Sequence, residues 1–260
     1  MTKSDLSAES ISHGLATRFI GRCTVYHERL PTTMDAARDE ARSGGGEGTV
    51  IVAGEQTAAR GRLKRTWLSP RGNLAFSVVL YPTKAQLSGL IMVSSLAVAG
   101  GIEAVSGLRP DVKWPNDVLV AGRKVCGILI ESSFQTGRLE YAIVGVGINV
   151  NLDPADFPEI TPIATSLSLE LGKGVSRTEL LRAVLTEMER LYQASHEAVF
   201  HQWRNRLVTL GNDVSITSGE TTLDGVAESV DPDGSLMLRL PDGSLTRITI
   251  GDVSLRQHAD

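Results

Sequence analysis

Cysteine is scarce in this chain, and its placement excludes the commonest structural uses of a thiol. Cys23 and Cys126, the only two cysteines, lie far apart and belong to no Cys-x-x-Cys or Cys/His cluster. This spacing argues against a disulfide framework or a structural zinc site and is typical of a reducing compartment, so we expect a cytoplasmic protein. Cys126 lies in the apolar run 124–130, which favours a small buried thiol.

Long uninterrupted apolar runs are also missing. The longest candidate, residues 87–105, is broken by serines, glycines and Glu103, which favours a buried helix over a membrane span. Residues 1–19 lack the cationic start and apolar block of a signal peptide. We therefore expect neither export nor a membrane partner.

Positive charge is not in excess, since the net charge is −4 and the isoelectric point is near 5.8. Such a chain as a whole is not an electrostatic nucleic-acid binder. Residues 1–22 are also too few for a helix-turn-helix module ahead of the core. The five histidines show no metal-ligand spacing and no serine lies in a nucleophile elbow, so neither zinc chemistry nor a covalent enzyme intermediate is expected.

What is present is the composition of an α+β protein, with 42% hydrophobic residues, 22% charged residues and 26 glycines. Apolar patterning predicts strands at residues 23–28, 49–53, 74–81, 116–120, 124–131 and 139–150, and helices at residues 34–42, within 82–107, at 178–193 and at 196–210. Residues 113–151 in particular predict antiparallel strands joined by short turns. We expect a mixed, largely antiparallel sheet with helices.

From Gly211 the pattern changes to short alternating strands, expected at residues 213–217, 223–230, 235–240 and 244–250. Turn residues separate them. The pattern predicts a β-barrel of about 50 residues appended to the larger domain. We place the two domains at residues 1–210 and 211–260.

A cationic segment, residues 56–70, carries the first chemical signal. It concentrates four cations within six residues, and no acidic residue occurs between Glu55 and Glu103. Gly61 permits close backbone approach, and Trp67 can offer a flat surface to a ring. Because the chain is otherwise acidic, this concentration indicates an anionic ligand such as a triphosphate or an acyl-phosphate, which suits arginine. A solvated charged loop is the alternative.

A second motif, Lys113-Trp114-Pro115-Asn116-Asp117, places a lysine and an aspartate on either side of a rigid Trp-Pro corner. Asp117 could hold Mg²⁺ or orient a lysine, and Lys113 could meet a phosphate. The alternative is a strand connection with an ordinary surface salt bridge.

Two glycine-bearing strands complete the pattern. Lys124 begins an apolar strand, where its ammonium is costly unless paired with Asp117 or with a ligand carboxylate. Gly127 within that strand marks a place where another group approaches the backbone. Residues 145–151 lack the third glycine of a dinucleotide fingerprint and no helix follows, so a strand against a flat ligand is favoured. Residues 44–48 are no P-loop, because no Gly-Lys-Ser/Thr follows.

In this order, the four segments resemble the biotin–protein ligase family. That family carries Gly-Arg-Gly-Arg-x-Gly-Arg-x-Trp, Lys-Trp-Pro-Asn-Asp, Arg/Lys-Lys-x-x-Gly-Ile-Leu-x-Glu and Gly-x-Gly-Ile-Asn. The match is dense over residues 21–151 and reaches the closing Ser254-Leu255-Arg256. One motif alone is weak, whereas four in order with a matching tail are specific. The resemblance implies an α+β core related to class II aminoacyl-tRNA synthetases and an SH3-like C-terminal domain.

The resemblance also implies roles, residue by residue. Biotin contacts are implied for Thr32, Thr33, Gln56, Arg60, Lys124 and Gly127. Nucleotide contacts are implied for Arg62, Arg65, Trp67, Lys113, Asn116, Asn149 and Arg256. Catalysis falls to Arg60, Arg62, Lys113 and Lys124, and Mg²⁺ to Asp117. The chain departs from the family at Ala59 and Lys64, where glycines are usual, and at Thr32-Thr33-Met34, where the family has Ser-Thr-Asn.

The implied reaction is attack of biotin's carboxylate on the α-phosphate of MgATP, followed by transfer to a lysine of a biotin carboxyl carrier protein. Fixed cations would offset charge developing on phosphorus, and loop closure would exclude water from the hydrolysable adenylate. Homodimers occur within the family. A lipoate or octanoate ligase of the same fold is the nearest alternative, followed by a biotin-sensing repressor and a non-catalytic biotin-binding module.

Overall fold

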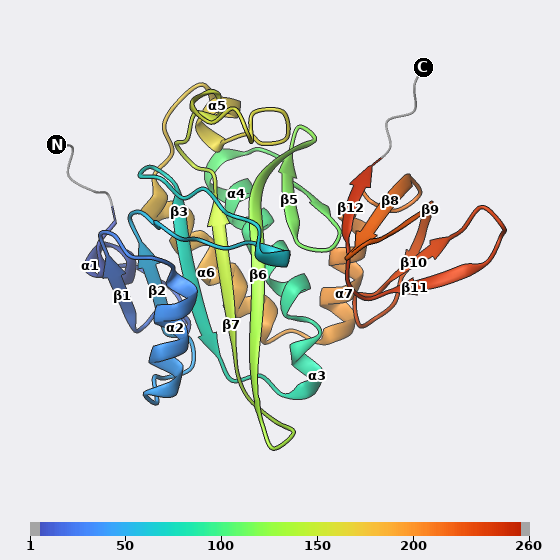
Figure 1. Ribbon diagram of the computed structural model, residues 1–260. Helices are drawn as coiled ribbons and strands as arrows, with labels where there is room; N and C mark the ends of the chain where they lie inside the picture. The colour runs from blue at the N-terminus through green and yellow to red at the C-terminus, as the bar shows by residue number, and fades with distance from the viewer. Residues whose placement is uncertain (1–5, 256–260) are drawn as a thin grey trace.

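The computed structural model describes residues 6–255, and its larger domain is built on one seven-stranded sheet (Figure 1). The strand order is β1-β2-β3-β7-β6-β5-β4, with β1 and β2 parallel and all other neighbours antiparallel. The strands are β1 (Thr24–His27), β2 (Val50–Ala53), β3 (Leu74–Leu80), β4 (Asp111–Lys113), β5 (Asp117–Val120), β6 (Arg123–Gln135) and β7 (Arg138–Ile148). The expected mixed, largely antiparallel sheet is confirmed.

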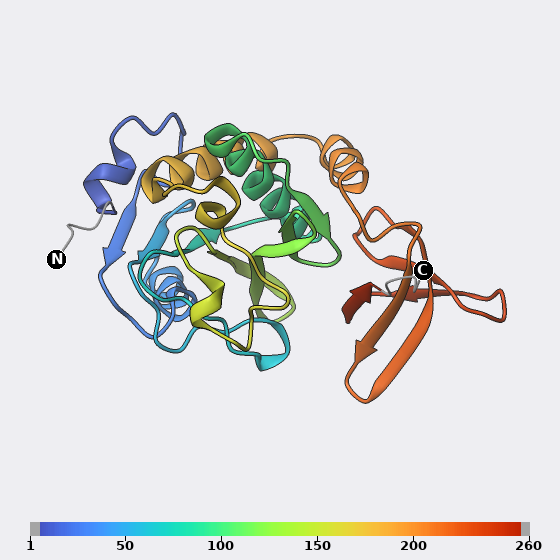
Figure 2. The ribbon, with the colours of Figure 1, turned by 90° about the horizontal axis from the view of Figure 1, so that it is seen from above.

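Long helices cover one face of this sheet, and the main core lies beneath them (Figures 1 and 2). The central helix, α4, is mostly buried and apolar on nearly all sides, as a helix between a sheet and further helices must be. It ends at Gly107, whose φ of 72° is the left-handed conformation that glycine adopts readily. The helices are α1 (Ala8–Ser12), α2 (Thr33–Arg42), α3 (Lys84–Leu87), α4 (Leu90–Ser106), α5 (Leu167–Leu171), α6 (Arg177–Tyr192) and α7 (His196–Asn205), with 3-10 turns η1 (Arg62–Lys64) and η2 (Pro154–Asp156).

Among the α-helices of residues 6–255, α2 alone packs on the opposite face, which we call the site face (Figure 2). This helix begins at the N-cap Thr32, whose hydroxyl accepts a hydrogen bond from Met34 N at 3.3 Å. It packs on one end of the face through a second, smaller core formed by Met34, Ala37, Ala41, Ile51, Val79, Tyr141 and Ile143. The remainder of the site face is left open to other groups.

Small residues line up across the middle of the site face. Successive strand partners from β2 to β5 are Ala53, Ala75, Gly147, Gly127 and Asp117. Because only alanine and glycine occupy this row on four neighbouring strands, β2, β3, β7 and β6, the face is hollowed along it. Gly145 and Gly147, which alternate along β7, therefore leave a depression in this face of the sheet.

The C-terminal domain is an antiparallel sheet of order β11-β10-β9-β8-β12. Its strands are β8 (Asp213–Ser218), β9 (Thr221–Val230), β10 (Leu236–Arg239), β11 (Leu245–Ile248) and β12 (Asp252–Leu255). The SH3-like architecture is confirmed, with β12 as a strand that the sequence did not predict, and the division at 210/211 stays a prediction. Two hydrogen bonds fix a turn of this domain to the larger one, from Trp114 Nε1 to Gly234 O at 2.8 Å and between His196 Nε2 and Pro232 O at 2.7 Å.

The long buried helix expected within residues 82–107 is confirmed as α4, which the short helix α3 precedes. One sequence prediction needs correction. The last helix ends at Asn205 instead of residue 210, since the following segment pairs with β4 through a bridge between Val112 and Leu207. No helix of the described residues is long and apolar enough to cross a membrane.

Candidate active site

A cavity of about 790 Å³ opens on the site face. The sheet forms its floor, and the cationic segment, the corner before β5 and the strand β12 form its walls. Its volume is within the range of small-molecule sites. It is lined by every described residue to which the resemblance gave a role in the site: Thr32, Thr33, Gln56, Arg60, Arg62, Arg65, Trp67, Lys113, Asn116, Asp117, Lys124, Gly127 and Asn149. Arg256 lies outside the described residues.

One end of the cavity, the α2 end, presents neutral polar groups that fix one another. The backbone N–H and the hydroxyl of Thr33 both donate to Gln56 Oε1, at 2.7 and 3.1 Å. The Ser77 hydroxyl on the floor donates to Thr33 Oγ1 at 2.8 Å. Thr32 and Thr33 are nearly fully buried, so these positions are rigid. The α2 end can therefore recognise an uncharged polar ring.

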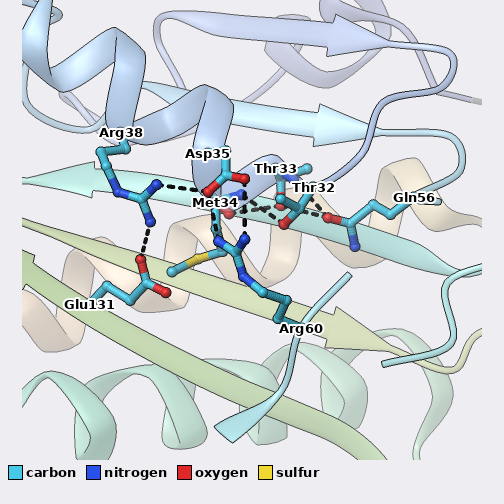
Figure 3. Close-up of polar contacts among 9 residues, drawn as sticks. Thr32, Thr33, Met34, Asp35, Arg38, Gln56, Arg60 and Glu131 are labelled. Atoms are coloured by element: carbon cyan, nitrogen blue, oxygen red, sulfur yellow. Dashed lines mark hydrogen bonds and ion pairs between the residues drawn. The ribbon is translucent and has the colours of Figure 1, made fainter. Parts of the chain in front are cut away.

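Charged side chains stand at the rim of the α2 end (Figure 3). Arg60 from the cationic segment donates to both carboxylate oxygens of Asp35, at 2.6 and 3.3 Å. Arg38 donates to the same carboxylate at 2.7 Å and also pairs with Glu131. The hydrogen bond from Arg60 lowers the pKa of Asp35, although partial burial acts in the opposite direction. The rim thus carries a line of alternating charges that the sequence did not reveal.

Trp67 occupies the hollow above the floor glycines. A Cβ atom on Gly147 would collide with Trp67 Nε1, and one on Gly127 would lie 3.1 Å from Trp67 Cζ3. Lys124 Nζ is 5.4 Å from the centroid of the indole, which permits a cation–π attraction. The close approach that Gly127 predicted is made by the protein's own indole, and the flat ligand expected against residues 145–151 stays a prediction.

Lys124 forms an ion pair with Asp117, whose Oδ1 is 2.5 Å from the ammonium nitrogen. The sequence left open whether Asp117 or a ligand would be its partner. Asp117 Oδ1 is a buried oxygen, and the Lys124 ammonium is its charged partner.

The Trp-Pro corner aims two charged side chains into the cavity. Trp114 is buried, its peptide bond to Pro115 is cis, and its N–H donates to Thr209 Oγ1 at 2.9 Å. Burial lowers the pKa of Lys113, while the negative charges of Asp117 and Asp252 act to raise it. The alternative of a surface salt bridge between Lys113 and Asp117 is disfavoured, because Asp117 pairs with Lys124 instead.

The C-terminal domain closes the cavity through Asp252, a residue that the sequence did not single out. Its carboxylate lies 2.6 Å from Arg65 Nη2 and 3.6 Å from Arg62 Nη1. Arg62 also donates to Asn116 Oδ1 at 3.3 Å and to Gly251 O at 3.2 Å. Burial lowers the pKa of Arg62, but a guanidinium stays protonated in proteins. Arg62 thus joins three separate segments at the edge of the site.

Asn149 lies in the cavity wall, and so do Met34 and Ala59, two of the positions at which the chain departs from the family pattern. The Asn149 amide is nearly fully buried; it accepts from Asn73 Nδ2 at 3.3 Å and donates to Thr165 O at 3.1 Å. Its implied nucleotide contact stays a prediction. Met34 lies against Gly145, where a Cβ atom would collide with its sulfur. Ala59 is buried and its carbonyl accepts from Trp67 N at 3.0 Å, so a methyl group fits there.

Comparison with known sequences identifies the protein family to which this chain is similar. A sequence model of the biotin/lipoate A/B protein ligase family matches residues 26–149, and one of the biotin protein ligase C-terminal domain matches residues 209–256. The bifunctional ligase/repressor BirA of Bacillus subtilis is 35% identical over 258 residues, which span 96% of this chain and 79% of the relative. The chain belongs to the biotin/lipoate A/B protein ligase family.

Two further comparisons place this ligase-family chain among the members named for biotin. The biotin–[acetyl-CoA-carboxylase] ligase of Paracoccus denitrificans is 35% identical over 205 residues, 74% of this chain and 85% of the relative. The solved biotin protein ligase of Aquifex aeolicus in complex with biotin and ATP matches with a TM-score of 0.73 at 28% identity, over 91% of this chain and 99% of that one. The resemblance drawn from the four motifs is confirmed.

Proposed function

We propose that this chain is a biotin–protein ligase that activates biotin with ATP and transfers it to a lysine of a biotin carboxyl carrier protein. The observation that carries the proposal is one cavity with neutral polar groups at the α2 end and converging cations at the other end. The first end suits an uncharged polar ring and the second suits a triphosphate. The names of the relatives and the ligands of the Aquifex structure support biotin and ATP.

In the first step, an oxygen of biotin's carboxylate attacks the α-phosphorus of ATP while the bond to pyrophosphate breaks. Lys124 and Arg62 line the end of the cavity opposite α2, where the phosphates of ATP would lie beside them. Their fixed positive charges offset the charge that develops on the phosphate oxygens. No protein nucleophile is needed, because positioning of the two reactants alone can contribute up to about 7–11 kcal/mol.

In the second step, the amine of the carrier lysine attacks the carbonyl carbon of biotinyl-5′-AMP, a C–N bond forms and AMP leaves. The mixed anhydride is prone to hydrolysis, so water must be kept away from it. The cationic segment lies over the cavity and is tied down at both ends by the pairing of Gln56 with Ser69, whose N···O distance is 3.0 Å. This cover excludes water while the intermediate waits for the carrier.

Asp117 is the residue that we propose for Mg²⁺. Its carboxylate lines the cavity, and the described residues contain no group of three His, Cys, Asp or Glu side chains that could hold a metal alone. A single carboxylate of this kind fits Mg²⁺, which in nucleotide sites takes one or two carboxylates together with substrate phosphates. When bound, the ion would neutralise charge on the phosphates.

The test is incubation with MgATP, biotin and a carrier domain, followed by measurement of the carrier's mass and of pyrophosphate. We expect the carrier to gain one biotinyl group, and a carrier whose target lysine is replaced by arginine to gain none. Lipoate and octanoate are assayed in parallel. Pyrophosphate release with either of these acids and not with biotin would instead support the lipoate or octanoate ligase of the same family.

We further propose that the chain works in the cytoplasm without binding nucleic acid, and as a homodimer. The net charge of −4 supports the absence of nucleic-acid binding, and the resemblance to the family supports the homodimer. A gel shift with biotin and ATP present checks nucleic-acid binding, and a retarded band would contradict it. Sedimentation equilibrium measures the oligomeric state, and a monomer at all concentrations would contradict the dimer.

A further inference from the structure

Asp35 lies at the centre of a line of four alternating charges, which we call the charge strap: Arg60, Asp35, Arg38 and Glu131 (Figure 3). Arg60 Nη2 is 2.6 Å and Arg38 Nη1 is 2.7 Å from the same oxygen, Asp35 Oδ1. The other oxygen of Asp35 accepts from Arg60 Nη1 at 3.3 Å. Asp35 therefore receives Arg60 through both carboxylate oxygens, the geometry that fixes a guanidinium best.

The charge strap connects three elements that surround the α2 end of the cavity. Arg60 comes from the cationic segment, Asp35 and Arg38 from α2, and Glu131 from β6. Asp35 lies in the first turn of α2, directly after Thr32, Thr33 and Met34, which line the same end. The strap thus passes along the rim of the part of the cavity that holds the acid in our proposed function.

Arg60 depends on Asp35 for its position. Its side chain is 41% exposed, and its guanidinium has no other hydrogen-bond acceptor within the described part of the chain. The backbone around it is held separately, by Ala58 N donating to Pro31 O at 2.8 Å and by the bridge between Arg60 and Thr66. Loss of the Asp35 charge would therefore release the side chain without releasing the segment.

We propose that Asp35 is a positioning residue, which holds the Arg60 guanidinium at the rim of the α2 end before the acid substrate arrives. The inference rests on the proposed function, because it assigns the acid to this end of the cavity. An arginine that is already ordered loses less side-chain freedom when it meets the ligand. Asp35 itself contacts no substrate and acts only through Arg60.

The first test is Asp35→Asn, which keeps the shape of the side chain and removes its charge. We expect the KM for biotin to rise about three- to tenfold, which corresponds to the cost of ordering one long side chain. The KM for MgATP and the melting temperature should stay unchanged. The matched control is Asp39→Asn, the same substitution one turn further along α2 on an exposed side chain, which should alter none of these values.

The decisive test combines Asp35→Asn with Arg60→Gln. If Asp35 acts through Arg60, the two changes raise the KM for biotin no more together than Arg60→Gln does alone. Independent, multiplying effects would show a structural role for Asp35 and overturn the inference. A lower KM in Asp35→Asn would also overturn it, because it would mean that Asp35 withholds Arg60 from the substrate.

Ionic strength gives a second readout that packing alone would not move. The strap is partly exposed, so salt screens it, and the KM for biotin of the unaltered protein should rise with salt more steeply than that of Asp35→Asn. Equal slopes would contradict the inference. An unaltered protein that releases no pyrophosphate with biotin would sink the proposed function, whereas an active protein indifferent to Asp35→Asn would sink this inference alone.

Discussion

The two ends of the cavity differ in the charge of the groups that would contact a ligand. At the α2 end the buried groups are neutral, and charge is kept at the rim, where Arg60 is 41% exposed. At the other end, which we call the cation end, charges line the wall itself: Lys124 is 28%, Asp117 20% and Arg62 21% exposed. Neutral hydrogen bonds suit a ring that carries no charge, and partly desolvated cations suit phosphates.

This difference predicts how each end responds to damage. A hydrogen bond between two neutral groups makes a net contribution of about 0.5–1.5 kcal/mol to stability. A charged group left without its partner in a partly buried site costs several times more. Substitutions at the cation end should therefore reduce the rate of activation strongly. Substitutions at the α2 end should mainly weaken the binding of the acid.

The largest effect is expected for Lys124→Met, which keeps the length of the side chain and removes the ammonium. Catalysis loses a fixed cation beside the developing charge, so kcat/KM for pyrophosphate release should fall about 100- to 1000-fold. The control is Lys173→Met, an exposed lysine for which turnover should not change. Adenylate formation at the normal rate by Lys124→Met would remove this residue from the machinery.

Two alanine substitutions on β7 separate the ends directly. In Gly147→Ala the added carbon collides with the rigid indole of Trp67, and such overpacking costs about 1–3 kcal/mol, so the KM for MgATP should rise roughly tenfold or more. In Gly145→Ala it meets the flexible end of Met34, so a smaller rise in the KM for biotin is expected. If both variants affected both substrates equally, the division of the cavity would be wrong.

Asp252→Asn tests whether the C-terminal domain serves the cation end. The change removes the charge that ties Arg62 and Arg65 to β12. Because Arg65 is 69% exposed, its pair contributes little, and the effect comes from Arg62. We expect the KM for MgATP to rise about three- to fivefold while that for biotin is unchanged. Glu220→Gln, an exposed change in the same domain, is the control, and equal behaviour of both variants would show that Asp252 has no part in the site.

Local sequence patterns predicted much of this arrangement. Residues 139–150 form a nearly continuous apolar run because β7 is buried on both faces, residues 124–131 form a similar run at the start of β6, and both strands were found there. Gly127 indicated a close approach to its backbone, because a glycine within a strand leaves room for a neighbouring group. What approaches it, Trp67, could not be predicted, because it lies 60 positions away and only the completed sheet brings the two together.

The site contacts that the sequence did not predict join residues that are distant in the chain. Asp35 and Arg60 are separated by 25 positions, and Arg62 and Gly251 by 189. Acidic residues on a short helix or a short strand give no periodic signal of their own. β12 has four residues, too few for an alternation to stand out, so Asp252 was not recognised.

The smallest expected effect concerns the proton on Lys113 and tests whether burial shapes the cation end. Burial disfavours the charged form and lowers the pKa of Lys113, while Asp117 and Asp252 partly restore it. The ammonium is present below this lowered pKa and is lost as pH rises through it, so the KM for MgATP should increase a few-fold on the alkaline side.

Lys113→Arg should remove that alkaline increase, because a guanidinium stays protonated throughout the range. Asp252→Asn should shift the increase to lower pH, since it deletes a charge that favours the ammonium. At the α2 end no titrating lysine lines the wall among the described residues, so the KM for biotin should stay flat over the same range. A KM for MgATP that rises equally in Lys113→Arg would assign the titration to another group and would leave Lys113 as an ordinary, fully solvated cation.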